Sequence, residues 1–546
     1  MGLRIDLFTP VTRVSVSLHF LDYLVLAVYG LGIIALSIVV SRRQKTAEDY
    51  FVAGRSMPAW AVAMAMMAAL ISSNTLVAHP ATAYKEGLIL LLGSFTLPIV
   101  LIFVAKVIVP FYRNVVGMSA YEYLGARFGF GSRLYASACF VADRIFDVGA
   151  TIITTAIPIK VMTGWNYTPV VLCITGFTVI YTMFGGMKTV VWTSVVQGFV
   201  FIAAAAVILG RLLLAPEAGP PGAVIAQAWH AGKFSLGNFD LSWNSLFDTT
   251  TTTQWLFILA YTTNWARRYI ADQHMVQRYL IARTDRDASR AAIWNGLVCV
   301  PVWATFMFIG VCLYGYYQAS GETPPAIADH VIPLFIMQHM PAGIVGLLLA
   351  AILAASMSSI SPDINSVATV LTADHVGHFF PKMTDAAKLL CGRIMVALGG
   401  GGAALIALLL IPGKGTHSVM ENVVTVSAIL SGGMLGLFFL GFFTRRATRT
   451  GCYTGIIACL LFTAWGTLTG AGHRVVDLGF NFTMHPILLG VFSHVVLFVV
   501  GYVTSLLFGG YRPDNVDQLT FRRKNSPAAP GASPPDTPPV ATASTS

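Results

Sequence analysis

The sequence predicts an all-α polytopic membrane protein with about 13 transmembrane helices. Of its 546 residues, 56% are hydrophobic and only 11% are charged, far below the roughly 25% charged residues of a soluble domain. The mean hydropathy of +0.71 agrees with this. Apolar runs of about 20 residues, the length that a helix needs to cross a bilayer, recur along the whole chain.

Thirteen segments meet this length requirement. In chain order they cover residues 20–40, 58–80, 88–110, 134–162, 167–185, 187–214, 247–268, 291–317, 342–372, 387–412, 418–443, 451–470 and 486–508.

The distribution of Lys and Arg predicts the orientation, because cytoplasmic loops retain these residues. One alternating set of loops carries most of them, including the cluster from Arg267 to Arg290. We therefore expect a multi-pass protein of the plasma membrane, in a bacterium the inner membrane, with its N-terminus outside and its C-terminus in the cytoplasm. The net charge of +10 follows from the same bias and does not indicate nucleic-acid binding.

Motifs of enzymes are absent from the sequence. It has no His-Glu-x-x-His, no Gly-Lys-Ser/Thr phosphate loop and no Gly-x-Ser-x-Gly elbow, and its seven cysteines form no metal-binding or disulfide pattern. We expect no catalytic activity.

Polar residues interrupt the second and ninth segments, where they face a cavity or a partner more often than lipid. In the second, SSNT ends at Thr75 and His79-Pro80 follows; Pro80 removes a backbone donor and predicts either a helix break beside a binding site or a simple kink. In the ninth, AASMSSISPDINS carries hydroxyls from Ser356 to Ser361. These hydroxyls either bind an ion or join helices through hydrogen bonds.

Charged residues appear in two further segments. Arg267 and Arg268 end the seventh, either as cytoplasmic anchors or as a bidentate site for a carboxylate. In the fourth, Arg144 and Asp147 are three residues apart, hence on one helix face, and predict a structural ion pair.

Three stretches together resemble the sodium/solute symporter family: YTMFGGMKTVVWTSVVQG from Tyr181, ADQHMVQRYLIAR from Ala271, and GLLLAAILAASMSSISPDINSVATVLTADH from Gly346. The resemblance covers about residues 20–510. It implies a LeuT-like fold of two inverted five-helix repeats, with the binding site near the midplane where the first helix of each repeat is broken.

The resemblance also implies a domain organisation. An N-terminal segment with one extra helix covers 1–57, the repeats cover 58–214 and 247–443, and an extracellular loop of 215–246 separates them. Two C-terminal helices cover 444–510, and a disordered cytoplasmic tail covers 511–546, whose end is rich in Pro, Ala and Ser.

By similarity, a sodium ion should lie between the second and ninth segments. Its implied ligands are backbone carbonyls and two hydroxyls, from Ala68, Ile71, Ala355, Ser358 and Ser359. A second ion or proton site is implied less strongly: Ser194 stands where many members have an aspartate, and Ser361 and Asp363 are its remaining candidates. The loss of the acid predicts one sodium ion per transport cycle.

The expected function is sodium-coupled symport of a small polar solute by alternating access. The residues expected at the solute are Ser73, Asn74, Thr75, His79, Asn264, Trp265 and Arg268, which do not match the set of the sugar-carrying members. The pattern from Ala78 to Gly87 resembles the branch that carries monocarboxylates, iodide and vitamins, so we favour a carboxylated or anionic solute. A sugar symporter, a proton-coupled transporter using His79 or Asp363, a channel and a non-transporting sensor remain open.

Overall fold

The computed structural model describes residues 18–42, 46–249, 252–411, 426, 430, 432–470 and 474–521. Within these ranges the chain is helical and contains no β-strand, only an isolated bridge between Met57 and Ala282. The prediction of an all-α membrane protein is confirmed.

The helices follow in chain order. The first part of the chain forms α1 (Phe20–Ser41), α2 (Ala47–Val52), α3 (Ala59–Leu70), α4 (Ser73–Glu86), α5 (Leu91–Phe103), α6 (Val109–Val115), α7 (Tyr121–Phe128), α8 (Phe130–Thr163), α9 (Tyr167–Leu213) and α10 (Ala223–His230). The second part forms α11 (Gln254–Ile270), α12 (Gln273–Ile281), α13 (Asp285–Ser320), α14 (Val331–His339), α15 (Ile344–Val370), α16 (Gly377–Phe379), α17 (Asp385–Leu409), α19 (Met434–Phe443), α20 (Arg449–Thr469) and α21 (Ile487–Phe508).

Nine helices of the described ranges are long and apolar enough to span a membrane, or ten if α3 and α4 form one bent span. The 47-residue α9 would be about 70 Å long, more than twice the thickness of the hydrocarbon core. Gly186, with φ 55° and ψ −168°, interrupts it, where the predicted spans 167–185 and 187–214 meet. Part of the span predicted at 418–443 lies outside the described residues, so the count of thirteen remains a prediction.

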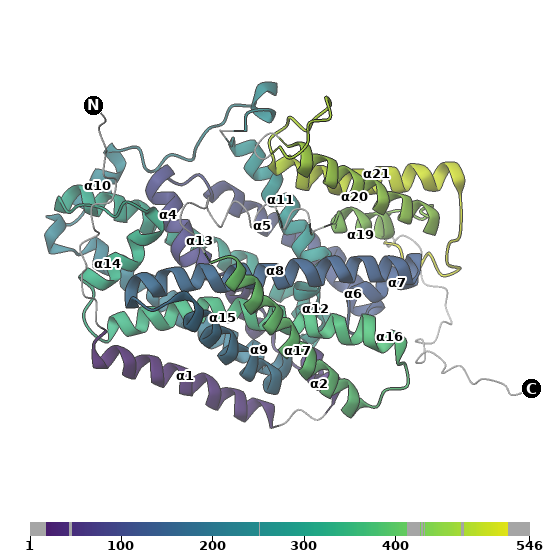
Figure 1. The fold of residues 1–546 in the computed structure, drawn as a ribbon, viewed down its shortest axis with the longest axis horizontal. Coiled ribbons are helices and arrows are strands. Elements are labelled where there is room, and N and C mark those ends of the chain that lie inside the picture. The colour runs from purple at the N-terminus through teal and green to yellow at the C-terminus, as the bar shows by residue number, and fades with distance from the viewer. Residues whose placement is uncertain are drawn as a thin grey trace, which may run out of the picture.

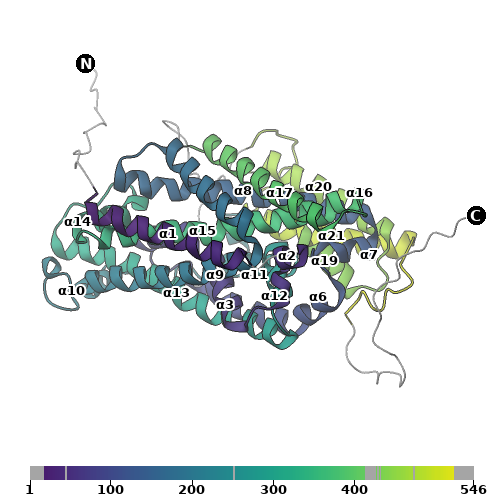
Figure 2. The same cartoon turned by 90° about the horizontal axis from the view of Figure 1, so that it is seen from below.

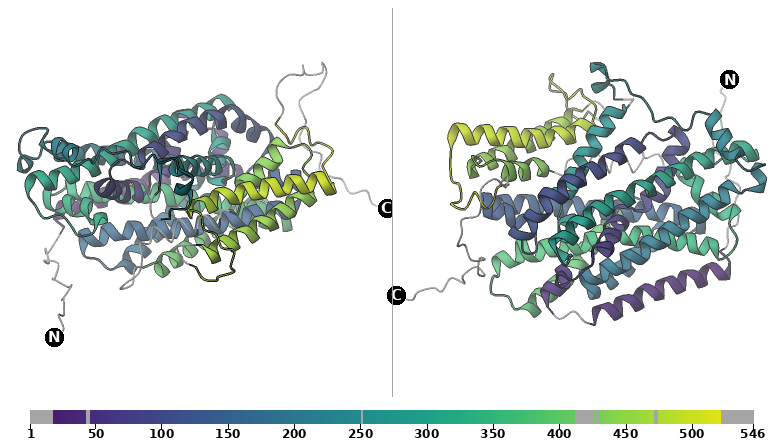
Figure 3. Two further views of the ribbon diagram at one scale, coloured as in Figure 1. Left: turned by 90° about the horizontal axis from the view of Figure 1, so that it is seen from above. Right: turned by 180° about the vertical axis from the view of Figure 1, so that it is seen from behind.

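Helix α15 forms the centre of the molecule. It packs against α8, α9 and α17 (Figure 1), and every residue from 354 to 370 is buried. Helix α1 lies along the outside, against α9 and α15 (Figure 2). Helices α20 and α21 pack together at the opposite edge from α1 (Figure 3). The hydroxyl-rich ninth segment is therefore enclosed by protein and not by lipid.

The prediction of a disordered tail from residue 511 is wrong for its first eleven residues. Tyr123 Oη of α7 donates a 3.0 Å hydrogen bond to the carbonyl of Leu519, and the Phe521 amide donates one of 2.8 Å to the carbonyl of Phe442 in α19. These contacts hold the segment against the bundle, which its composition did not reveal. Residues 522–546 lie outside the described residues.

Candidate functional site

The second predicted span is broken, but not where the sequence indicated. Helices α3 and α4 meet at an angle of 56°, and the non-helical residues are Ile71 and Ser72. Ser72 caps α4 by accepting a hydrogen bond from the Asn74 amide. Pro80 lies inside α4 beside Gly310 of α13, where a Cβ would approach the Pro80 carbonyl to 2.2 Å. The break therefore lies at the start of SSNT and not at Pro80, and α4 continues through the proline.

The serine pair of α15 meets the broken end of α3. Ser358 Oγ donates hydrogen bonds to the carbonyl of Ala68, at 2.8 Å, and to that of Ala355, at 3.0 Å. Ser359 Oγ lies 3.0 Å from the carbonyl of Ala69. Four of the five predicted sodium ligands thus come together, on two helices far apart in the chain. Hydroxyl and carbonyl oxygens are the ligands that a hard cation prefers.

Ile71, the fifth predicted ligand, lies at the end of α3. Its backbone is non-helical, with φ −91° and ψ 89°, and no described hydrogen bond joins it to the serine pair. Ala69, which was not among the predicted ligands, supplies the nearby carbonyl because the helical turn presents residues 68 and 69 to successive serines.

The helix of the seventh predicted span is followed by a break, three residues beyond the predicted end at residue 268. Helix α11 ends at Ile270 and α12 begins at Gln273. Asp272 caps α12, since its Oδ1 accepts a 3.1 Å hydrogen bond from the His274 amide. The breaks at 71–72 and 271–272 are the two positions at which the family resemblance placed the binding site.

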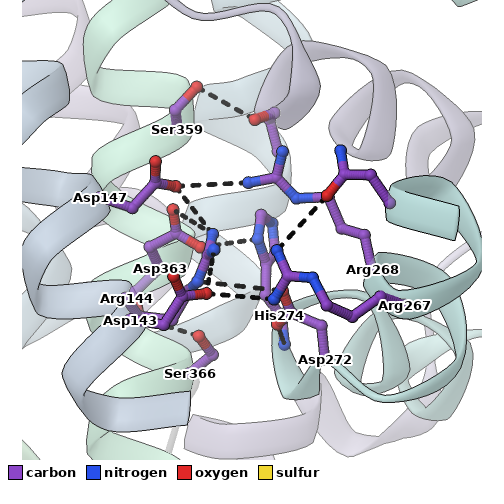
Figure 4. Close-up of polar contacts among 12 residues, drawn as sticks. Asp143, Arg144, Asp147, Arg267, Arg268, Asp272, His274, Ser359, Asp363 and Ser366 are labelled. Atoms are coloured by element: carbon purple, nitrogen blue, oxygen red, sulfur yellow. Dashed lines mark hydrogen bonds and ion pairs between the residues drawn. The ribbon is translucent and has the colours of Figure 1, made fainter. Parts of the chain in front are cut away.

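A cluster of charged side chains surrounds the second break (Figure 4). Arg144 of α8 pairs with Asp147 at 2.8 Å, which confirms the predicted pair, and with Asp143 at 2.7 Å. Its guanidinium also lies 3.8 Å from Asp272 and 3.8 Å from Asp363 of α15. Arg144 is therefore at the centre of four carboxylates.

Further pairs join α11 and α12 to α8 and α15. Arg267 lies 3.2 Å from Asp143, and Arg268 lies 3.3 Å from Asp147. His274 Nδ1 lies 2.6 Å from Asp363 Oδ1. The sequence showed charges in each segment but not that they converge. His274 lies in the stretch from Ala271 that carries the family resemblance, but it was not among the predicted site residues.

The cluster is balanced in charge. Its four carboxylates are Asp143, Asp147, Asp272 and Asp363, and its four guanidinium groups are Arg144, Arg267, Arg268 and Arg278. Burial of charge is tolerated where opposite charges pair.

Two members of the cluster are partly exposed. Side-chain exposure is 28% for Asp147 and 19% for Arg268, against at most 8% for Asp143, Arg144 and Arg267. Arg268 is thus the most accessible of these three arginines, and its guanidinium lies beside Asp147.

Of the other residues expected at the solute, some are buried and some are accessible. Ser73 is fully buried and joins a hydroxyl cluster, where Thr155 Oγ1 lies 2.9 Å from Ser73 Oγ and 2.8 Å from Ser356 Oγ. Thr75 is also buried, and Trp265 stacks on Trp303 with ring centroids 5.3 Å apart. These three side chains are buried in this structure.

The other residues expected at the solute have more accessible side chains. Asn264 is exposed and lies one turn before Arg268 on α11. His79 Nδ1 lies 3.3 Å from the Asn74 carbonyl on α4, and both residues are partly exposed. The assignment of all seven residues to the solute stays a prediction.

The three candidates for a second ion site lie on two helices, α9 and α15. Ser194 of α9 and Ser361 of α15 are both buried on helices that pack together. Asp363 instead pairs with His274 and belongs to the charge cluster. The second ion or proton site therefore stays a prediction.

Comparisons with known proteins agree with this geometry. The model of the sodium:solute symporter family matches residues 50–459. The sodium/sialic acid symporter NanT of Aliivibrio fischeri is 30% identical over 92% of this chain and 97% of its own. The human sodium-coupled monocarboxylate transporter 1 is 27% identical over 81% of this chain and 72% of its own.

One solved structure is similar over nearly the whole chain. It is that of a Na+-coupled sialic acid symporter in a substrate-bound outward-open state, with a TM-score of 0.81, 28% identity, and coverage of 90% of this chain and 98% of that one. The chain therefore belongs to the sodium:solute symporter family, and its coupling ion is sodium.

Proposed function

We propose that the protein is a multi-pass symporter of the plasma membrane that uses one sodium ion to import a small carboxylated solute, without an enzymatic step. The observation that carries this proposal is the approach of Ser358 and Ser359 to the carbonyls at the end of α3, at one helix break, together with a partly exposed guanidinium on α11 at the other. An oxygen site for a cation and a cationic site for an anion thus adjoin the two helix breaks.

The proposed sodium ion binds between α3 and α15, where the serine hydroxyls and the carbonyls of Ala68 and Ala355 supply oxygens. Because the ion bridges two helices from different repeats, it favours the arrangement in which they are in contact. If the solute binds the same state, each ligand raises the affinity for the other by the same factor.

The proposed solute places its carboxylate at Arg268 and its polar groups near Asn264, Asn74 and His79. The charge balance of the cluster supports an anion as the partner of sodium. One sodium ion and one carboxylate add no net charge to a buried network, whereas a neutral solute would leave the charge of the sodium ion uncompensated. The relatives named for sialic acid and monocarboxylates carry solutes of this class.

The proposal also includes the orientation, with the N-terminus outside and the C-terminus in the cytoplasm. It rests on the excess of Lys and Arg in one set of loops.

The test is uptake into proteoliposomes that contain the purified protein. Labelled sialic acid, lactate and glucose are offered with an inward gradient of sodium, of choline, or of protons without sodium. We expect accumulation of one of the two carboxylates in the sodium condition alone. Accumulation of glucose would favour the sugar branch, accumulation driven by protons would replace sodium as the coupling ion, and no accumulation of any solute would contradict symport of these classes.

A further inference from the structure

Two arginines lie on opposite sides of the break between α11 and α12. Arg268 precedes the break by three residues and its side chain is 19% exposed. Arg278 follows it, near the end of α12, and is fully buried. If the proposed orientation holds, Arg268 lies on the extracellular side of the break and Arg278 on the cytoplasmic side.

Arg278 differs from the other three arginines of the cluster in its contacts. Arg144, Arg267 and Arg268 each lie within 3.3 Å of a carboxylate oxygen. Among the described residues, Arg278 has no carboxylate within 4.0 Å. It uses one nitrogen, Nη1, to donate a 2.8 Å hydrogen bond to the His274 carbonyl, and its Nε and Nη2 have no partner within the described part of the chain.

An unpaired buried guanidinium is costly, because each unsatisfied donor loses its hydration without a replacement. The carboxylates of Asp272 and Asp363 and the guanidinium of Arg268 lie in electrostatic range of Arg278 but do not bind its free nitrogens. A planar group with two adjacent donors is the geometry that binds a carboxylate bidentately. The free edge of Arg278 is thus suited to the same chemical group as Arg268.

We propose that Arg278 is an inner subsite for the carboxylate of the transported solute. The proposal rests on the proposed function, which it extends: the carboxylate binds Arg268 from outside and then contacts Arg278 on its way to the cytoplasm.

Helix α12 closes this subsite in the present structure, since all nine of its residues are buried. Gln273 accepts a 2.7 Å hydrogen bond from the Ala120 amide, at the start of α7. Gln277 donates to the Phe51 carbonyl, at 2.5 Å, and to Thr369 Oγ1, at 3.0 Å. These contacts tie α12 to α7, α2 and α15, so Arg278 becomes accessible only when they break and the cytoplasmic half opens.

The neighbouring acids give the subsite a low affinity, which suits release. Asp272 and Asp363 repel a carboxylate bound at Arg278, whereas Arg268 has one carboxylate, Asp147, already beside it. A weak inner contact lowers the barrier to leaving the outer site without trapping the solute.

The experiment measures transport from each face separately. Right-side-out and inverted membrane vesicles from cells that express the protein are given labelled sialic acid and lactate with a sodium gradient. The wild type is compared with Arg278→Gln, Arg278→Lys and Arg290→Gln. Arg290 is a matched control, because it is exposed on α13 and has no described contact with the cluster.

For Arg278→Gln we expect the half-saturating solute concentration at the cytoplasmic face to rise about tenfold or more, as for the loss of a charged hydrogen bond. At the extracellular face it should change less than twofold. Arg278→Lys keeps the charge and should give an intermediate shift, and Arg290→Gln should change neither face.

Equal changes at both faces, or no change at either, would overturn the inner subsite while leaving the proposed function intact. If Arg278→Gln does not reach the membrane, Arg278→Lys decides, and unaltered kinetics at the cytoplasmic face would then reject the proposal. Failure of the wild type to transport either carboxylate would instead contradict the proposed solute class, and the subsite with it.

Discussion

The Ser358 hydroxyl of α15 donates a 2.8 Å hydrogen bond to the carbonyl of Ala68 in α3. These residues are 290 positions apart, and both belong to the set that family resemblance assigned to sodium. In this hydrogen bond the hydroxyl proton lies between the two oxygens. A bound cation requires both oxygens to turn their lone pairs toward it, so the same pair serves either as a helix contact or as part of an ion site.

Replacing either serine should remove the stabilisation by sodium. The melting temperature of the purified wild type should rise in sodium chloride relative to potassium or choline chloride, since a ligand at a hundredfold excess over Kd stabilises by about 2.7 kcal/mol. Ser358→Ala and Ser359→Ala should lose this shift. Ser366→Ala is the control, because the described hydrogen bond of Ser366 Oγ goes to the Asp363 carbonyl of its own helix. Equal melting temperatures of the wild type in all three salts would mean that Ser358 and Ser359 have a purely structural role.

Arg268→Gln should weaken carboxylate transport far more than it weakens folding. The side chain is partly exposed and pairs with Asp147 at 3.3 Å, so its loss leaves Asp147 with Arg144. We expect the half-saturating concentration at the outer face to rise about tenfold or more, with little change in melting temperature. Arg474→Gln, on the exposed segment before α21, controls for loss of a surface arginine; unchanged uptake by Arg268→Gln would remove this residue from the site.

Transport should be electroneutral if one sodium ion accompanies a solute with one negative charge. Each net positive charge carried inward would gain about 2.3 kcal/mol per 100 mV of membrane potential, but this pair carries none. A potassium diffusion potential set by valinomycin should therefore leave the initial rate of carboxylate uptake unchanged. Acceleration by an inside-negative potential would indicate a second sodium ion, despite Ser194 at the position of the usual acid.

Breaking the pair of Asp143 and Arg267 should destabilise the fold. The two side chains are 0% and 8% exposed and 3.2 Å apart, and removal of one partner from a buried pair costs about 3–5 kcal/mol. Asp143→Asn and Arg267→Gln should each lower the melting temperature, and the double variant should lower it by less than the sum. Strict additivity in this double-mutant cycle would show that the pair carries no coupling.

Asp22 should anchor the extra N-terminal helix. It is buried in α1, and its Oδ1 accepts hydrogen bonds from the amides of Gly343, at 2.7 Å, and Gly346, at 2.8 Å, at the start of α15. Asp22→Ala leaves two donors unsatisfied and should cost about 1–3 kcal/mol. Ser41→Ala, at the exposed end of α1, should be neutral, and equal melting of both variants would mean that α1 is not held by this carboxylate.

Composition and residue pattern by themselves determine much of this protein. Apolar runs specify a helical membrane protein, because only helices and closed barrels satisfy all their backbone hydrogen bonds in lipid. Polar residues inside such runs indicate that a helix is interrupted, but not at which residue. The pair of Arg144 and Asp147 follows from helical spacing alone. The sequence also indicated that Ser358 and Ser359 contact polar atoms, because hydroxyls in a buried helix need hydrogen-bond partners.

Tertiary structure decided which partners these groups have. The close approach of α4 to α13 at Pro80 depends on Gly310, where a Cβ would meet the proline carbonyl at 2.2 Å. The engagement of Asp363 by His274 depends on how α12 docks on α15. The local sequence indicates that a charge or a helix break exists. The energy with which two charges pair depends on the distance between segments far apart in the chain, and this distance is set only when the helices pack.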